Sequence, residues 1–219
     1  MPSKLVIFDL DMTLIDSRED IAASVARALK MRCGVDLLIR DVYPFIGCGL
    51  ADTFRGLAPE ADEENVRACV REYRRWFYDH CHDRSRLYDG VQKGLAQLRS
   101  TGYLLAVATA KRNFMAYRVL GSFGLTDAFD IICGADGLAP KPDPAIVHSV
   151  CKSAAIHPME SVMIGDTTMD VLAGQGAGAK TIAVTYGIGD EKELKALNPD
   201  FISPDFNSVL GVLFKLRKH

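Results

Sequence analysis

Polar residues follow three separate apolar segments of this chain. Asp9 and Asp11 come directly after the apolar run at residues 5–8, with one residue between them. Thr109 follows a second apolar run, and Asp166 follows a third, which ends in VMIG. In an open parallel sheet, ligands bind beyond the carboxyl ends of the strands, where the strand order reverses. The sequence therefore predicts that these side chains meet at one edge of a sheet.

Carboxylates from two distant places in the chain suit a hard divalent cation. Mg²⁺ takes oxygen ligands and usually keeps several waters, so two neighbouring carboxylates and a third from another strand form a suitable ligand set. A bound cation would also offset the repulsion that otherwise raises the pKa of one carboxylate. Taken singly, each of these residues also fits a turn or a helix cap.

Short apolar strands alternate with amphipathic helical stretches along most of the chain. This alternation predicts an α/β fold with a doubly wound, mostly parallel, Rossmann-like sheet. A helical stretch at residues 90–102 ends at Gly102, where a left-handed cap is expected. Weaker signals predict a last strand and a last helix beyond residue 200. The main strands are expected at residues 5–8, 103–108, 131–133, 162–164 and 181–184.

Residues 17–86 break the alternation, because they carry helical periodicity and no convincing strand. An insertion of roughly 70 residues is much longer than the usual connection in a compact α/β unit. We therefore expect an α/β catalytic core at residues 1–16 and 87–219. A small helical cap, or lid, is expected at residues 17–86.

The composition is that of an ordinary soluble globular protein, with 48% apolar residues, 25% charged residues and a formal net charge of -2. No basic stripe points to nucleic acid, and no apolar run reaches membrane-spanning length. The first apolar run is too short for a signal-peptide core, which favours a cytoplasmic location. Without a C-x-x-C pair, the cysteines are expected to be reduced and mostly buried. They are Cys33, Cys48, Cys69, Cys81, Cys133 and Cys151.

Four short motifs, in order along the chain, resemble the signatures of the haloacid-dehalogenase-like superfamily and of its phosphoglycolate phosphatase-like branch. The motifs read DLDMT, LLAVATAKR, KPDP and GDTTMD. The segments DSREDIAASV, YDGV and AGAKTIAVTYG resemble the same branch, so the resemblance covers essentially the whole chain. The matching residues are Asp9, Asp11, Thr13, Thr109, Lys141, Asp166 and Asp170.

The resemblance implies a phosphatase that works through an aspartyl-phosphate. Asp9 would be the nucleophile, and Asp11 would protonate the leaving group and then activate water. Mg²⁺ would be held by Asp9, by Asp11 through its backbone carbonyl, and by Asp166.

The remaining matches imply a site for the phosphoryl group. Thr13, Thr109 and Lys141 would bind that group, and Asp170 would orient Lys141 or a metal-bound water. The expected partner is a small phosphorylated metabolite, and the expected assembly is a monomer or a homodimer.

The cap residues and two departures from the pattern bear on specificity. Gly47 and Gly49 in FIGCGL resemble the family's cap loop that faces the active site, although loop glycines also serve backbone geometry alone. Arg55 is a candidate substrate contact, although helix arginines are usually solvated. Ala110 stands where the branch often has Asn, and Met12 stands where Gly is common and asks for room beside the nucleophile.

Several activities stay open at this stage. A phosphosugar mutase is disfavoured because DSREDIAASV lacks the early cap His, and a halide-displacing enzyme is disfavoured because it needs no acid at Asp11. A phosphonate hydrolase lacks an obvious cap Lys, although Lys30 prevents a firm exclusion. Pyrophosphatase and nucleotidase activities remain, as does a non-catalytic phosphate-binding regulatory module, since a fold alone does not determine function.

Overall fold

The computed structural model describes residues 4–47 and 49–217, so Cys48 lies outside the described residues. Contacts divide the chain into two compact units. One comprises Met1–Asp16 and Leu87–His219, and the other comprises Ser17–Arg86.

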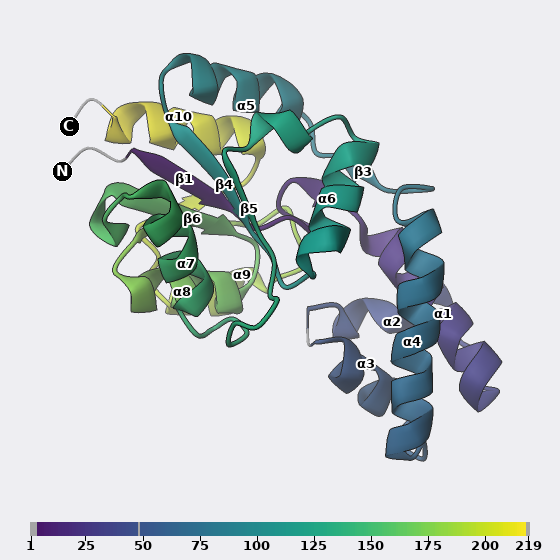
Figure 1. Ribbon diagram of the computed structural model, residues 1–219. Coiled ribbons are helices and arrows are strands. Elements are labelled where there is room, and N and C mark those ends of the chain that lie inside the picture. Colours follow the sequence, from purple (N-terminus) through teal and green to yellow (C-terminus); the bar gives the residue numbers. More distant parts are fainter. Residues whose placement is uncertain (1–3, 48, 218–219) are drawn as a thin grey trace. The chain divides into compact units, whose positions relative to one another are not determined.

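The larger unit is built on a six-stranded sheet (Figure 1). The strand order is β5-β4-β1-β6-β7-β8, and every neighbouring pair is parallel. The predicted α/β class with a parallel sheet is therefore confirmed. The strands are β1 (Leu5–Phe8), β4 (Leu104–Ala108), β5 (Ile131–Cys133), β6 (Ser161–Gly165), β7 (Lys180–Val184) and β8 (Phe201–Ser203).

Helices cover both faces of this sheet (Figure 1). The α5 and α10 helices pack together on one face, and α7 and α8 pack together on the other. Because both faces are covered, β1 reads as a continuous apolar run rather than as an alternating one. The helices of this unit are α5 (Val91–Ser100), α6 (Asn113–Ser122), α7 (Ala145–Ala154), α8 (Thr168–Ala177), α9 (Glu191–Ala196) and α10 (Phe206–Leu216).

Successive side chains of β1 point to opposite faces and anchor both helical layers. Leu5 and Ile7 belong to a buried cluster that includes Val147 of α7. Phe8 stacks on Phe206 of α10, with the two ring centroids 6.0 Å apart. Side chains on both faces of β1 are packed against helices. This packing fixes the position of the carboxyl end of β1 and of the residues that follow it.

The strand order reverses around β1. The chain runs from β1 to β4 and β5 on one side of the sheet, and then returns to β6 on the other side of β1. Such a reversal opens a crevice at the carboxyl ends of the neighbouring strands. The segments after β1, β4 and β6 are therefore brought together.

Periodicity identified most elements but missed some. Three predicted strands differ from the observed ones by one residue at an end, which is the usual uncertainty of such bounds. The missed α8 reads TMDVLAGQGA, in which small residues allow close packing on the sheet. A Cβ added at its Gly174 would lie 2.7 Å from the Thr181 side chain and 2.8 Å from that of Met163. Gly102 has a φ of +83°, in agreement with the expected left-handed cap.

The smaller unit is helical, and α1 and α4 make its main contact. The buried carboxylate of Asp20 in α1 accepts hydrogen bonds from the backbone N–H groups of Arg84 and Ser85 and from the Ser85 hydroxyl. Short strands β2 (Ile15–Asp16) and β3 (Arg86–Leu87), which periodicity did not predict, pair with each other. The helices are α1 (Arg18–Cys33), α2 (Ile39–Val42), α3 (Leu50–Leu57) and α4 (Glu63–His80).

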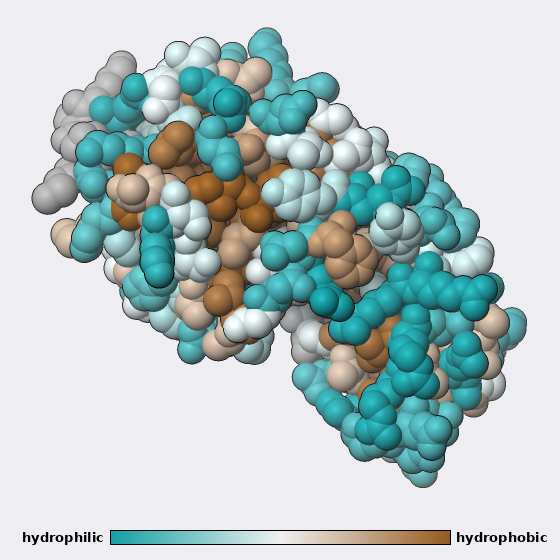
Figure 2. All heavy atoms as spheres, viewed as in Figure 1, coloured by the Kyte–Doolittle hydropathy of each residue, from teal (hydrophilic) through white to brown (hydrophobic). Residues whose placement is uncertain are grey.

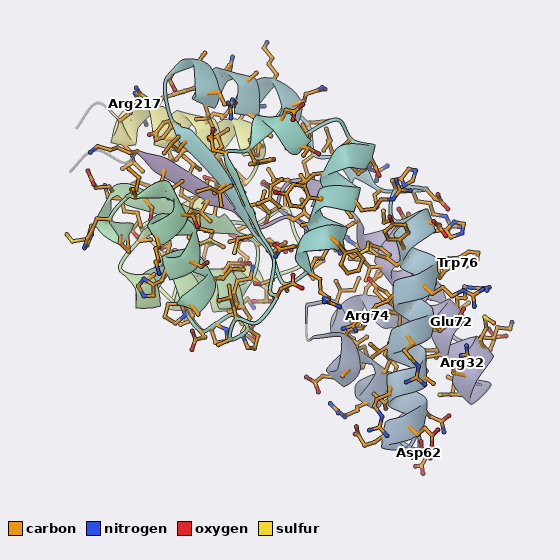
Figure 3. All side chains as sticks on the ribbon, viewed as in Figure 1. Arg32, Asp62, Glu72, Arg74, Trp76 and Arg217 are labelled. Atoms are coloured by element: carbon orange, nitrogen blue, oxygen red, sulfur yellow. The ribbon has the colours of Figure 1, made fainter. Side chains whose placement is uncertain are left out.

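Side chains labelled in Figure 3 tie α1 to α4. Arg32 of α1 donates to the buried carboxylate of Glu72 at 2.9 Å. Trp76 stacks against the His80 ring and lies under the Arg27 guanidinium, whose carbon is 3.8 Å from the Trp76 ring centroid. Arg27, Trp76 and His80 line a cavity of about 330 Å³. None of the residues predicted to do chemistry lines this cavity.

The visible surface of the helical unit is largely polar, and most of the described cysteines are buried. Polar and charged residues cover most of the visible face of the helical unit (Figure 2). The five cysteines in the described part of the chain form no disulfide, and three of them are buried. None of the helices at residues 4–47 and 49–217 combines the length and apolar character that a membrane crossing requires.

Candidate active site

The first acidic pair lies at the carboxyl end of β1. The Asp9 N–H donates to the Ile164 carbonyl at 2.8 Å, which extends the pairing of β1 with β6 by one residue. The chain then turns at Met12, which has a φ of 58° in the left-handed region. Glycine adopts that conformation without steric cost. The backbone conformation, rather than a need for space beside the predicted nucleophile, therefore explains why Gly suits this position. The Met12 side chain is buried.

Lys141 bridges two carboxylates in the interior. Its Nζ atom lies 2.6 Å from Asp9 Oδ1, 2.5 Å from Asp170 Oδ1 and 3.2 Å from the Ala108 carbonyl oxygen. Its side chain is only 7% exposed, so it is not a solvated loop lysine. The structure therefore brings together residues that lie 132 positions apart in the chain.

Asp170 is placed by the start of α8. The Thr167 hydroxyl donates to Asp170 Oδ2 at 2.6 Å, and the Thr167 N–H donates to the same oxygen. The Asp170 N–H in turn donates to Thr167 Oγ1, which completes a capping box. Asp170 thus uses one oxygen for the helix cap and the other for Lys141. Sequence reasoning missed Thr167, although its position three residues before an acid is a capping-box signal.

Asp166 is held by two donors from different segments. The Thr13 hydroxyl donates to Asp166 Oδ1 at 3.1 Å, and the Ile188 N–H donates to Asp166 Oδ2 at 2.9 Å. The Tyr186 hydroxyl donates to the Thr13 carbonyl at 2.8 Å and supports this arrangement. In this structure Thr13 therefore orients a carboxylate, and its predicted contact with a phosphoryl group stays a prediction.

Thr109 and Lys111 follow β4. Thr109 is buried, and its hydroxyl accepts the Lys111 N–H at 3.2 Å. Because α6 begins only at Asn113, Thr109 is not the cap of that helix. Lys111 Nζ lies 2.8 Å from Asp11 Oδ2. Sequence reasoning missed Lys111, although it stands two residues after Thr109 in the second motif.

Burial changes the protonation of these groups. Burial raises the pKa of Asp9 well above its ordinary value, and Asp170 and Asp166 add to the rise while Lys141 opposes it. Burial and the Asp170 carboxylate raise the pKa of Asp166 to about 7. Burial alone would lower the pKa of Lys141, but the carboxylates of Asp170 and Asp9 raise it above its ordinary value. The two carboxylates therefore favour the charged form of Lys141.

The buried carboxylates fit a divalent cation. Ligand oxygens of Asp9, Asp166 and Asp170 all lie within 4.8 Å of one another. Among the described residues, the ammonium of Lys141 pairs with Asp9 and Asp170 and acts on Asp166 from farther away, so three buried carboxylates outnumber the cation and the cluster has excess negative charge. An all-oxygen donor set with excess negative charge suits Mg²⁺ or a similar hard ion. The Asp11 side chain is outside this set, and the predicted role of its backbone carbonyl in metal binding stays a prediction.

A known family model covers most of this chain. The family model of haloacid dehalogenase-like hydrolases matches residues 6–184 of this chain. The chain belongs to this family. The predicted family and the predicted enzyme class, a hydrolase of this kind, are therefore confirmed.

Relatives of this haloacid dehalogenase-like hydrolase match along nearly their whole length. Probable phosphatase IndB of Dickeya dadantii is 36% identical over 98% of this chain and 95% of its own. Pyrophosphatase PpaX of Bacillus velezensis is 33% identical, with 94% of each chain covered. The crystal structure of a predicted phosphoglycolate phosphatase from Haemophilus somnus superposes with a TM-score of 0.88 at 29% identity, covering 96% of this chain and 97% of that one.

The cap residues predicted for this hydrolase lie in the helical unit. Gly47 and Gly49 have positive φ angles of 97° and 85°, so backbone geometry alone requires glycine there. Arg55 forms ion pairs with Asp52 at 2.7 Å and with Glu63 at 2.9 Å. Contacts of these residues with substrate stay predictions.

Proposed function

We propose that this hydrolase is a Mg²⁺-dependent phosphatase of small phosphomonoesters that forms an aspartyl-phosphate on Asp9. The observation that carries the proposal is the contact of Lys141 with Asp9. A buried cation beside a carboxylate at a strand end favours the anionic form that attacks phosphorus, against the rise in pKa that burial causes, and provides charge for phosphoryl oxygens.

The two acids of the first motif serve different steps. Asp9 attacks phosphorus, forms an oxygen–phosphorus bond and displaces the leaving oxygen. Asp11, 19% exposed and outside the buried cluster, donates a proton to that oxygen. Asp11 then removes a proton from the water that hydrolyses the aspartyl-phosphate, which returns both residues to their starting states.

Residues around the pair bind and orient the reacting groups. Thr109 and Lys141 bind oxygens of the transferring phosphoryl group, and Asp170 keeps Lys141 in place. Asp9, Asp166 and the Asp11 backbone carbonyl would hold Mg²⁺, with Asp170 close to the same position. When bound, the cation supplies positive charge that stabilises the phosphoryl oxygens in the transition state.

The helical unit, Ser17–Arg86, is proposed to be a lid that excludes water and selects the leaving group. Its insertion between β1 and β4 supports this role, because lids of this kind gate turnover. Structures with and without a phosphate mimic should show different lid angles. The same lid angle and the same rigid packing in both would contradict the proposal.

The decisive test combines turnover with chemical trapping. The purified protein should hydrolyse members of a phosphate-ester panel with Mg²⁺ and lose that activity in EDTA, with activity restored by added Mg²⁺. Rapid quenching of a labelled substrate, followed by peptide mapping, should place the phosphoryl group on Asp9. Binding of phosphate without turnover would favour a non-catalytic phosphate-binding module instead. Label on another residue would overturn the assigned nucleophile.

A further inference from the structure

The two lysines of the site contact different members of the acidic pair. Lys141 contacts Asp9, the proposed nucleophile, whereas Lys111 Nζ lies 2.8 Å from Asp11 Oδ2. Asp11 is the proposed acid, so it must stand beside the leaving oxygen. Lys111 therefore marks the leaving-group side of the reaction, and Lys141 marks the phosphoryl side.

The backbone around Lys111 is held by neighbouring segments. Its N–H donates to Thr109 Oγ1 at 3.2 Å, and its carbonyl accepts from the Ala135 N–H at 2.9 Å. Gly134 approaches so closely that an added Cβ would lie 2.5 Å from the Lys111 carbonyl oxygen. The loops after β4 and β5 thus fix the base of the lysine, and its side chain is only 12% exposed. This cation is placed by the fold and is not a solvated surface charge.

The charge next to Asp11 decides which leaving groups the site tolerates. Once Asp11 has donated its proton, a leaving group with its own carboxylate or phosphate would meet the Asp11 carboxylate, and like charges repel at short range. A lysine ammonium has three donors, so it is able to hold Asp11 and a substrate oxygen together. A neutral leaving group gains little from such a cation, because Asp11 alone supplies the proton that it needs.

We infer that Lys111 is a specificity-determining residue that binds an anionic leaving group beside Asp11. The inference rests on the proposed function and extends it. The substrate class is a phosphate ester or anhydride whose leaving group carries a carboxylate or a phosphate. Pyrophosphate and phosphoglycolate, after which two of the similar proteins are called, both meet this chemical description.

The test removes one charge from the protein and, separately, one charge from the substrate. Phosphoglycolate is paired with 2-hydroxyethyl phosphate, in which a neutral hydroxymethyl group replaces the carboxylate. Lys111→Met should lower kcat/KM for phosphoglycolate by about 10- to 100-fold, the range of a hydrogen bond between charged partners. The loss for 2-hydroxyethyl phosphate should be less than about 3-fold, because the interaction is absent there. Lys111→Arg should restore much of the lost activity.

Arg112→Met is the matched control in the same loop. Arg112 carries the same charge, but its side chain is 58% exposed and pairs with Asp136. Its removal should leave the ratio of kcat/KM values for the two substrates unchanged. Melting temperatures of all variants check that they fold, and Lys111→Gln replaces Lys111→Met if the latter does not.

The outcomes separate this inference from the proposed function. Equal losses on both substrates would overturn the inference and show that Lys111 acts only through Asp11. Wild-type protein that prefers the neutral ester would overturn it too. If wild-type protein with Mg²⁺ hydrolyses neither substrate, nor pyrophosphate, nor an aryl phosphate, the proposed function fails and the inference fails with it.

Discussion

Lys141 Nζ lies 2.6 Å from Asp9 Oδ1, and both groups are buried at the carboxyl end of the central strands. The same ammonium contacts Asp170, so one cation offsets two carboxylates. Burial raises the pKa of Asp9, and Lys141 is the cation in the described structure that opposes this rise most directly. If Asp9 is the nucleophile, as proposed, this pair contributes to both stability and catalysis.

Lys141→Met should damage both properties. Loss of one preorganised cation costs about 10²- to 10³-fold in kcat, and breaking a buried ion pair costs about 3–5 kcal/mol of the free energy of unfolding. Steady-state kinetics and chemical denaturation measure the two effects. Lys152→Met, which removes an exposed lysine of α7, is the control and should change neither. Activity of Lys141→Met within about 3-fold of wild type would contradict the proposed role of this residue.

Asp11→Asn should distinguish the two steps of the reaction. Loss of a general acid costs about 10²- to 10⁴-fold, and the first step should suffer less with an aryl phosphate, whose leaving group needs little protonation. The base for the hydrolytic water is still missing in this variant. Phosphoenzyme on Asp9 should therefore accumulate with the aryl substrate, as measured by rapid-quench labelling. Asp9→Asn is the control and should form none. Equal losses for aryl and alkyl substrates without a trapped intermediate would mean that the roles of the pair are wrongly assigned.

Metal-free protein should lose stability as the pH rises. The pKa of Asp166 is about 7 in the folded protein and 3.8 for an unperturbed carboxyl. The folded state therefore binds this proton more tightly than the unfolded state does. The resulting stability is fully present below the unfolded pKa and is lost as the pH rises through about 7.

Melting temperatures in EDTA, measured from about pH 5 to about pH 8, check this prediction. Asp166→Asn should show a smaller decline, because its amide does not titrate. Added Mg²⁺ should raise the melting temperature more at the upper end of this range, where protons no longer compete for the carboxylates. A melting temperature that does not respond to Mg²⁺ at any pH would argue against a metal site at these residues.

Gly189→Ala should disturb the placement of Asp166. A Cβ at this position would overlap the Asp166 carbonyl oxygen, and a backbone atom cannot rotate away. We expect a loss of roughly 1–3 kcal/mol in the free energy of unfolding, together with weaker Mg²⁺ binding. Gly211→Ala in α10 is the matched control, because nothing lies within 4 Å of its added Cβ. This helical substitution should instead stabilise the protein by roughly 0.5–1 kcal/mol. Wild-type stability and Mg²⁺ affinity in Gly189→Ala would refute the predicted overlap.

The central strands could be predicted from the sequence because their apolar runs are local features. The run LVIF before Asp9 is apolar on both faces, since helices cover both sides of β1, and its end is marked by a charge. The α8 helix was not readable in this way. Its small residues carry little periodic signal. They are needed because Gly174 packs closely against Met163 of β6 and Thr181 of β7.

The sequence by itself determined the family and predicted which residues carry the chemistry, because residue type and order within short motifs are local properties. Only the tertiary structure decided how they are paired. Thr13 donates to Asp166, and Lys111 contacts Asp11, through contacts between loops that follow different strands. No local pattern encodes such a contact, since it depends on the strand order that places those loops side by side and on the burial that makes each charge need a partner.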